Sequence, residues 1–234
     1  MSDSAIVQFK LTDGVALISL DDGKANALSS PMMLQIDEAL TRAEAEAKAV
    51  VIAGRPGRFS AGFDLKVMMS GPANAKALVT QGAGLLLRLY EFPLPVVAAC
   101  TGHAVAGGAL MLLSCDTRLG VAGEFKLGLN EVAIGMTVPI LAQELARDRL
   151  APTRLSEAVL QSRMYTPDEA VAVGYLDAAV EPERLMAEAA ARAGLLAKMP
   201  RGAYAATKGR LRAATIAHIR ETLDADLSKL TAPM

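Results

Sequence analysis

The sequence has few of the side chains that build metal sites and disulfide frameworks. It contains 2 cysteines and 2 histidines among 234 residues. Cys100 and Cys115 both lie in an uncharged stretch, so we expect them to be small buried hydrophobic residues. His103 and His218 are far apart, and no metal-ligand spacing joins any of the four. No metal site is predicted.

An excess of charge of either sign is also missing. The chain has 24 basic and 25 acidic residues, which gives no basic footprint for a nucleic-acid partner. Its first ten residues, MSDSAIVQFK, lack the basic and then apolar pattern of a secretory signal. We therefore expect a cytoplasmic α/β protein with one large domain, or one domain with a helical appendage.

The longest stretch without a formal charge is residues 92–115, FPLPVVAACTGHAVAGGALMLLSC. Its length alone would suit a membrane-spanning helix of about 20 residues. Pro93, Pro95 and Gly102 interrupt it, however, so we predict a buried strand over 95–100, a turn over 101–106 and a helix over 107–115. No membrane partner is expected.

The start of that helix is a place where backbone N–H groups and the positive end of a helix dipole meet. Such a place binds anions or a carbonyl oxygen that is gaining negative charge. Gly108-Ala109 occupies the positions at which a phosphate-binding loop needs Lys-Ser/Thr, so phosphate binding is unsupported. No G-x-S-x-G motif occurs, so a hydrolase with a nucleophilic serine is unsupported too.

The same pattern occurs earlier in the chain. A buried strand at 50–53 leads through Ser60-Ala61-Gly62 to a short helix from Phe63, as 95–100 leads through Ala106-Gly107-Gly108 to its helix. Two such helix starts can lie side by side at one sheet edge. Two N–H donors that converge on one oxygen would form an oxyanion hole.

Four ordered motifs carry a family resemblance. They are FSAGFDLK at 59–66, GHAVAGG at 102–108, Cys115-Asp116, and GLNEVAIG at 128–135. Together they resemble the enoyl-CoA hydratase/isomerase (crotonase) family, from the first hairpin to about Pro182. The resemblance implies a spiral of strand–strand–helix units over 1–182, and a helical region used in trimerisation over 183–234. It also implies an acyl-CoA thioester substrate whose enolate the enzyme stabilises.

The resemblance assigns site residues one by one. It implies that the N–H groups of Ala61 and Gly107 are the two oxyanion-hole donors. Coenzyme A, which is part of the substrate and not a separate cofactor, is expected along the following positions: Lys24, Ala25, Ala27, Gly62, Asp64 and Leu65, with Gly108 and Leu110 beside them.

One departure from the family pattern bears on the reaction. Family hydratases carry two glutamates, and the position of one is occupied here by Leu110, while the other is present as Glu131. Adding water across a double bond usually needs two proton-transfer groups, whereas moving the bond from C3 to C2 needs one base. Apolar neighbours should desolvate Glu131 and raise its pKa. The sequence therefore favours a 3-enoyl-CoA isomerase with Glu131 as the base.

Two alternatives stay open. One is a hydratase or thioester hydrolase of the same family, for which Glu124 and Glu144 are the nearest spare carboxylates in sequence. The other is a binder of acyl-CoA without turnover. Asp116 is expected to be a buried structural acceptor, and His103 a satisfied turn histidine.

The last part of the chain raises two further expectations. Lys208, Arg210 and Arg212 form a basic cluster that is either a solvated helix face or a contact to the 3′-phosphate of coenzyme A. The helices after Glu183 carry an apolar stripe, which predicts a homotrimer or homohexamer. Its members are Leu185, Met186, Leu195, Leu196 and Met199.

Overall fold

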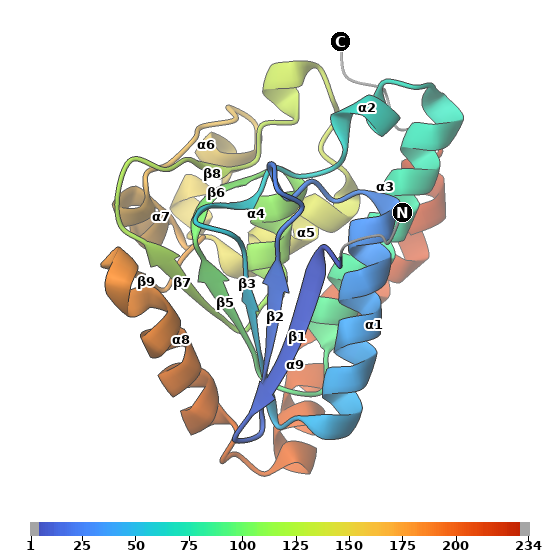
Figure 1. Cartoon of the computed structure of the whole chain (residues 1–234). Helices are drawn as coiled ribbons and strands as arrows, with labels where there is room; N and C mark the ends of the chain where they lie inside the picture. The colour runs from blue at the N-terminus through green and yellow to red at the C-terminus, as the bar shows by residue number, and fades with distance from the viewer. Residues whose placement is uncertain (1–4, 230–234) are drawn as a thin grey trace.

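A computed structural model describes residues 5–229 (Figure 1). Its larger sheet has six strands in the order β1-β2-β3-β5-β7-β9, and all neighbours except β1 and β2 are parallel. The strands are β1 (Val7–Thr12), β2 (Val15–Leu20), β3 (Ala49–Ala53), β5 (Val96–Cys100), β7 (Thr117–Val121) and β9 (Ala178–Val180). Asp13 and Gly14 both have positive φ, as the tight turn of the β1–β2 hairpin requires.

A second sheet has three short parallel strands in the order β4-β6-β8. These are β4 (Gly57–Ser60), β6 (Gly102–Val105) and β8 (Leu127–Gly128). Each follows one strand of the larger sheet and precedes helical chain: β3 leads to β4, β5 to β6, and β7 to β8. This repeat is the strand–strand–helix spiral that the sequence predicted, although the three short strands themselves were missed.

Most helices cover one face of the larger sheet, while α8 covers the other face (Figure 1). The helices are α1 (Ser30–Glu46), α2 (Leu65–Met68), α3 (Pro72–Glu91), α4 (Gly107–Ser114), α5 (Ile140–Arg149), α6 (Leu155–Val159), α7 (Pro167–Val173), α8 (Pro182–Leu196) and α9 (Arg201–Leu227), with 3₁₀ turns at Val132–Ile134 and Pro152–Arg154. Leu185, Ala189 and Ala193 of α8 pack on Val51 and Val97 of the sheet.

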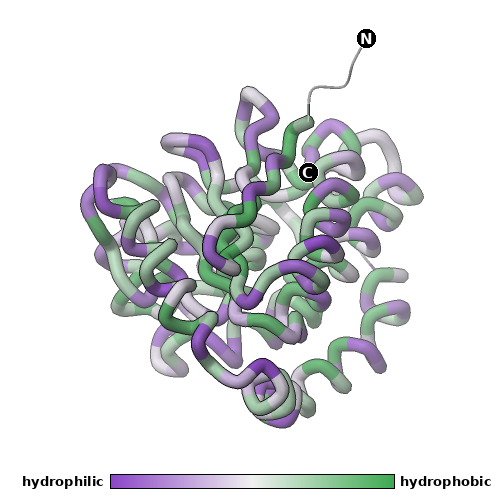
Figure 2. The backbone as a smooth tube through the Cα atoms, turned by 60° about the horizontal axis from the view of Figure 1, so that its bottom comes forward, coloured by the Kyte–Doolittle hydropathy of each residue, from purple (hydrophilic) through white to green (hydrophobic). Residues whose placement is uncertain are grey.

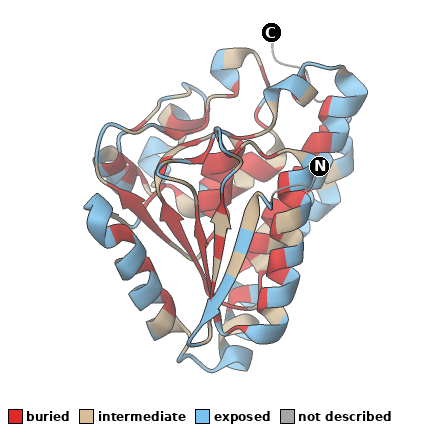
Figure 3. Ribbon diagram, viewed as in Figure 1, coloured by how far each residue is buried: buried red, intermediate tan, exposed pale blue. Residues whose placement is uncertain are grey.

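Burial follows this layering. The central strands and α4 are buried, while the outer sides of α1 and α8 face solvent (Figure 3). The outer helices accordingly carry both hydrophilic and hydrophobic turns (Figure 2). Within residues 5–229, no helix combines the length and apolar composition needed to cross a bilayer. The uncharged stretch 92–115 instead supplies β5, β6 and the buried helix α4.

Local sequence signals explain several element ends. Thr166 and Glu169 form a capping box at the start of α7, and Gly174 ends that helix with φ +103°. The cap of α1 is Ser29, whose side chain accepts the N–H of Met32. Gly202 lies inside the first turn of α9 and does not end it.

Candidate active site

The candidate site lies at one edge of the small sheet. Because β4, β6 and β8 are parallel, the residues that follow their carboxyl ends gather at the same place. The chain after these ends lines a cavity of about 280 Å³. The lining residues are Ala61, Phe63, Leu65, Met68, Met69, Ala106, Asn130, Glu131, Ile134 and Met136. Apolar side chains surround a single ionisable group, the carboxyl of Glu131.

Glu131 follows β8 by three residues and is only 7% exposed. Its backbone carbonyl accepts the N–H groups of Ile134 and Met136, which fixes the turn that carries it. Burial raises the pKa of its carboxyl, and the backbone N–H groups of Glu131 and Asn130 partly offset this effect. The Oε2 atom of Glu131 and the Oδ1 atom of Asn130 are buried without a partner among the described residues. A buried, unpartnered carboxyl oxygen with a raised pKa suits a proton-transfer group.

Two backbone N–H groups beside the cavity have no acceptor among the described residues. Gly62 has φ +87° and Ala106 has φ +50°, and the residues that follow them are Phe63 and Gly107. Within residues 5–229, the N–H groups of Phe63 and Gly107 donate to no other group. The two turns also touch, since a Cβ added to Gly62 would lie 3.0 Å from the Gly107 nitrogen. The left-handed φ of Ala106, costly for a residue with a Cβ, marks this turn as strained.

The prediction that Ala61 is an oxyanion-hole donor is wrong. Its N–H already donates to the carbonyl oxygen of Ala25 at 3.0 Å. The predicted Gly107 N–H is free, and its structural counterpart in the first unit is the Phe63 N–H. The equivalence of the two strand–turn–helix units could have identified Phe63. In each unit the free N–H belongs to the residue directly after the one with positive φ.

The segment predicted to hold coenzyme A is tied to the first turn of the site. The Leu28 N–H donates to the Gly62 carbonyl, and the Ser60 hydroxyl donates to the Asn26 carbonyl at 2.7 Å. Asn26 is fully buried and its side-chain amide donates to the Leu20 carbonyl oxygen. The structure therefore brings the segment of Ala25 and Ala27 beside Ala61 and Gly62, with Lys24 directly before it in the chain. Asn26 and Ser60, which hold the two segments together, were not singled out from the sequence.

The four remaining predicted substrate contacts have different surroundings in the structure. Leu65 is exposed and lines the cavity, and Asp64 caps α2 by accepting the Lys66 N–H. Gly108 packs α4 against β4, since a Cβ there would lie 2.2 Å from the Ser60 carbonyl oxygen. Leu110 is 3% exposed and is not among the residues that line the cavity. It belongs to the core of α4 and is not part of this cavity wall.

Residues set aside as structural have structural contacts. The Nδ1 atom of His103 accepts the Lys126 N–H at 3.0 Å, and its ring packs edge-on against Phe125. Asp116 accepts the Val96 N–H, as expected for a buried acceptor. Glu144, one of the spare carboxylates, pairs with Arg147, and neither it nor Glu124 lines the cavity.

The prediction of a solvated face was wrong for two members of the basic cluster. Lys208 and Arg212 are 6% and 4% exposed, so they are not on a solvated face. They bind Asp116, and Lys208 also donates to the carbonyl oxygens of Phe92 and Leu94. These contacts give both charges a structural role, while the contact to the 3′-phosphate stays a prediction. Arg210 is exposed.

Gly82 of α3 sets the position of Phe63. A Cβ at Gly82 would lie 2.1 Å from the Phe63 ring, whereas a Cβ at Gly84 would meet nothing within 4 Å. We expect Gly82→Ala to displace the ring and lower both stability and turnover. Gly84→Ala, the matched control, should keep turnover and stabilise the helix by up to about 1 kcal/mol. Thermal unfolding and turnover of both variants test this, and equal effects at the two positions would contradict the packing role of Gly82.

Comparisons with known proteins agree with this geometry. Residues 10–234 match the family model described as enoyl-CoA hydratase/isomerase. The chain belongs to the enoyl-CoA hydratase/isomerase family. A solved enoyl-CoA hydratase/isomerase family protein from Pseudomonas syringae is 41% identical with a TM-score of 0.94, covering 97% of this chain and 98% of that one. The predicted family and its crotonase-like fold are thereby confirmed.

Relatives within the enoyl-CoA hydratase/isomerase family have two kinds of name. Human mitochondrial enoyl-CoA delta isomerase 1 is 29% identical, covering 97% of this chain and 76% of that protein. A putative enoyl-CoA hydratase from Thermus thermophilus is 35% identical, covering 79% of this chain and 75% of that protein. The chain is therefore an acyl-CoA enzyme of this family, and the choice between the two reactions depends on the site.

Proposed function

We propose that this enzyme moves the double bond of a 3-enoyl-CoA to give a 2-enoyl-CoA. Ionised Glu131 takes a proton from C2, and the electron pair left behind delocalises through the double bond and the thioester carbonyl as a dienolate. Protonated Glu131 then returns the same proton to C4, so that the C3=C4 bond becomes C2=C3. One carboxyl group serves both steps, and the reaction neither consumes nor releases water.

Negative charge that develops on the thioester oxygen needs donors that are already in place. The free N–H groups of Phe63 and Gly107 lie on touching turns beside the cavity, and the Gly107 N–H is at the positive end of α4. We assign the oxyanion hole to these two groups. Coenzyme A would then lie along Lys24, Ala25 and Ala27, which adjoin Gly62.

The observation that carries this proposal is the single ionisable side chain in the lining. Among the described residues, Glu131 is the only carboxyl group there, and the family position for a second acid is occupied by Leu110, buried in α4. Hydration would require another group to orient water or deliver a proton. The naming of the Thermus relative keeps hydratase as the second candidate function. A thioester hydrolase and a binder without turnover remain as outcomes of the test.

Product analysis separates these outcomes. The purified enzyme is incubated with a 3-enoyl-CoA and, separately, with the matching 2-enoyl-CoA, and products are followed by chromatography. We expect interconversion of the two enoyl-CoA esters and negligible 3-hydroxyacyl-CoA. Efficient formation of 3-hydroxyacyl-CoA from the 2-enoyl ester would refute the single-base isomerase. Release of free coenzyme A thiol would indicate a hydrolase, and ligand binding without any product would indicate a binder.

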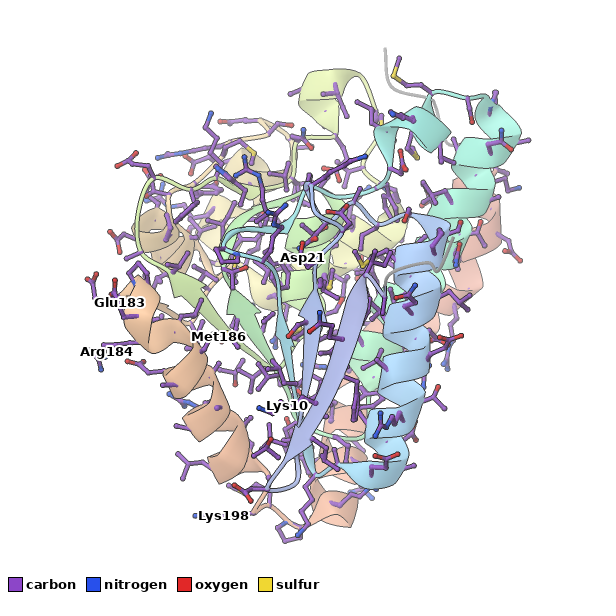
Figure 4. The ribbon with its side chains drawn as sticks, in the orientation of Figure 1. Lys10, Asp21, Glu183, Arg184, Met186 and Lys198 are labelled. Carbon is purple, nitrogen blue, oxygen red and sulfur yellow. The ribbon has the colours of Figure 1, made fainter. Side chains whose placement is uncertain are left out.

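We also propose that the enzyme assembles as a homotrimer or homohexamer. Leu185 is buried against the sheet, but Met186 and Leu195 of α8 remain exposed. Figure 4 shows Glu183 and Arg184 projecting outward from the first turn of the same helix, so polar and apolar side chains share its exposed sides. Light scattering at micromolar concentration should report three or six subunits. A monomer would contradict the assembly but not the catalytic proposal.

A further inference from the structure

A second cavity, of about 440 Å³, lies at the other end of α4. Its wall is formed by Asp116 after α4, Arg149 at the end of α5, and residues of α9 that include Lys208 and Arg212. The eight residues of α4 separate this cavity from Gly107, which corresponds to about 12 Å at 1.5 Å per residue. Its volume falls within the range of small-molecule sites. No step of the proposed reaction uses it.

The charges around this cavity do not balance. Arg149, Lys208 and Arg212 line it, and within residues 5–229 Asp116 is the only carboxylate in its lining. Asp148 adds one more negative charge near Arg149, although its carboxylate accepts the Tyr90 hydroxyl at 2.6 Å. Three cations therefore face two carboxylates. Arg118, another cation near Arg149, is paired with Asp177, so this pair does not change the charge balance. One positive charge is left over.

The hydrogen bonds show which cation is available. Lys208 already donates to three oxygens, and Arg212 contacts the Tyr90 carbonyl and Asp116. Arg149 uses its Nη2 atom on the carbonyl oxygens of Cys115 and Asp116. Its Nη1 atom makes no hydrogen bond within residues 5–229, and its Nε atom is buried without a partner. Arg149 is thus the group that lacks an acceptor.

The rest of the lining is apolar and open to solvent. Leu211 is 79% exposed and Met199 is 54% exposed, and Pro200 and Ala203 lie beside them. A ligand that satisfies both parts of the wall has one negative charge and a hydrocarbon chain. We propose that this cavity binds an aliphatic monocarboxylate, with its carboxylate on Arg149 and its chain along Met199 and Leu211. A medium-chain fatty acid has this chemistry.

Calorimetric titration of the full chain tests the site with octanoate as the probe. Octan-1-ol lacks the charge and inorganic phosphate lacks the chain, so each should bind at least about 10-fold more weakly. Leu211→Glu places a carboxylate at the cavity edge on an exposed position, and should weaken octanoate at least about 10-fold by repulsion and by occupying Arg149. Leu34→Glu is the control, because Leu34 is an exposed leucine of α1, outside this lining and outside the proposed subunit contact.

Each result decides the matter. Octanoate binding that falls in Leu211→Glu and persists in Leu34→Glu supports the site. Absence of octanoate binding overturns it. Equal binding by both variants also overturns it, because the octanoate would then bind outside this cavity. An equal loss of octanoate affinity in both variants points to a general charge effect and overturns the assignment. Phosphate that binds as tightly as octanoate shows that the hydrocarbon chain contributes nothing, which contradicts its proposed contact with Met199 and Leu211.

Discussion

Replacing Glu131 with glutamine is expected to lower the kcat for 3-enoyl-CoA isomerisation by at least about 100-fold, the low end for losing a general base. Glutamine keeps nearly the same shape but cannot accept and return the proton. The apparent affinity for substrate should change little, because coenzyme A would lie along the segment around Lys24 and not on Glu131. Steady-state kinetics with wild type and variant measure both quantities.

Two controls make this result specific to the base. Glu144→Gln removes a carboxylate that pairs with Arg147 outside the cavity, and should leave kcat unchanged. The pH profile supplies the second. Because burial raises the pKa of Glu131, the kcat of wild type should fall with decreasing pH at a value above the ordinary glutamate pKa of about 4.3, where the base becomes protonated. That acid limb should vanish in Glu131→Gln. A variant that keeps near wild-type turnover would remove Glu131 from the mechanism.

The parts of this site that the sequence predicted are those that depend on short stretches of consecutive residues. β3 and β5 are short uninterrupted apolar runs, and the predicted and observed bounds differ by no more than a residue. Glu131 was identified because it interrupts apolar neighbours at a family position, and Gly107 because it opens a helix after a strand. Each of these signals is carried by fewer than ten consecutive residues.

What the sequence could not predict depends on contacts between distant residues. β8 has only two residues, too few to show the alternation that identifies a strand, so the small sheet whose edge gathers the site was missed. The family resemblance implied that Ala61 is a donor, and no local pattern shows its hydrogen bond to Ala25, which lies 36 positions away in the chain. Lys208 looks like a surface residue on its own helix, and its acceptors are some 90 or more positions away.

The same distant contacts predict the largest effect on stability. Asp116 is the counter-ion of two buried cations, with its Oδ2 atom 2.6 Å from the Lys208 nitrogen and its Oδ1 atom 3.0 Å from an Arg212 nitrogen. The Oδ2 atom also accepts the Val96 N–H at 2.8 Å, which ties the start of β5 to the end of α4. Asp116→Asn keeps the shape but leaves both charges buried without a carboxylate. We expect it to lower the free energy of unfolding by about 3–5 kcal/mol, as for a broken buried ion pair.

Denaturant unfolding measures this loss, and a surface pair supplies the comparison. Glu46→Gln removes the partner of Arg42 on an exposed side of α1, and should cost less than about 1 kcal/mol. If Asp116→Asn costs no more than Glu46→Gln, the buried cations are not held by Asp116. Turnover per folded molecule should remain near wild type in Asp116→Asn, because α4 separates Asp116 from Gly107 by its full length. A large loss of kcat in the folded variant would show instead that the two ends of α4 are coupled. The ion pairs of Asp116 at the C-terminal end would then help to hold the Gly107 N–H in position at the N-terminal end.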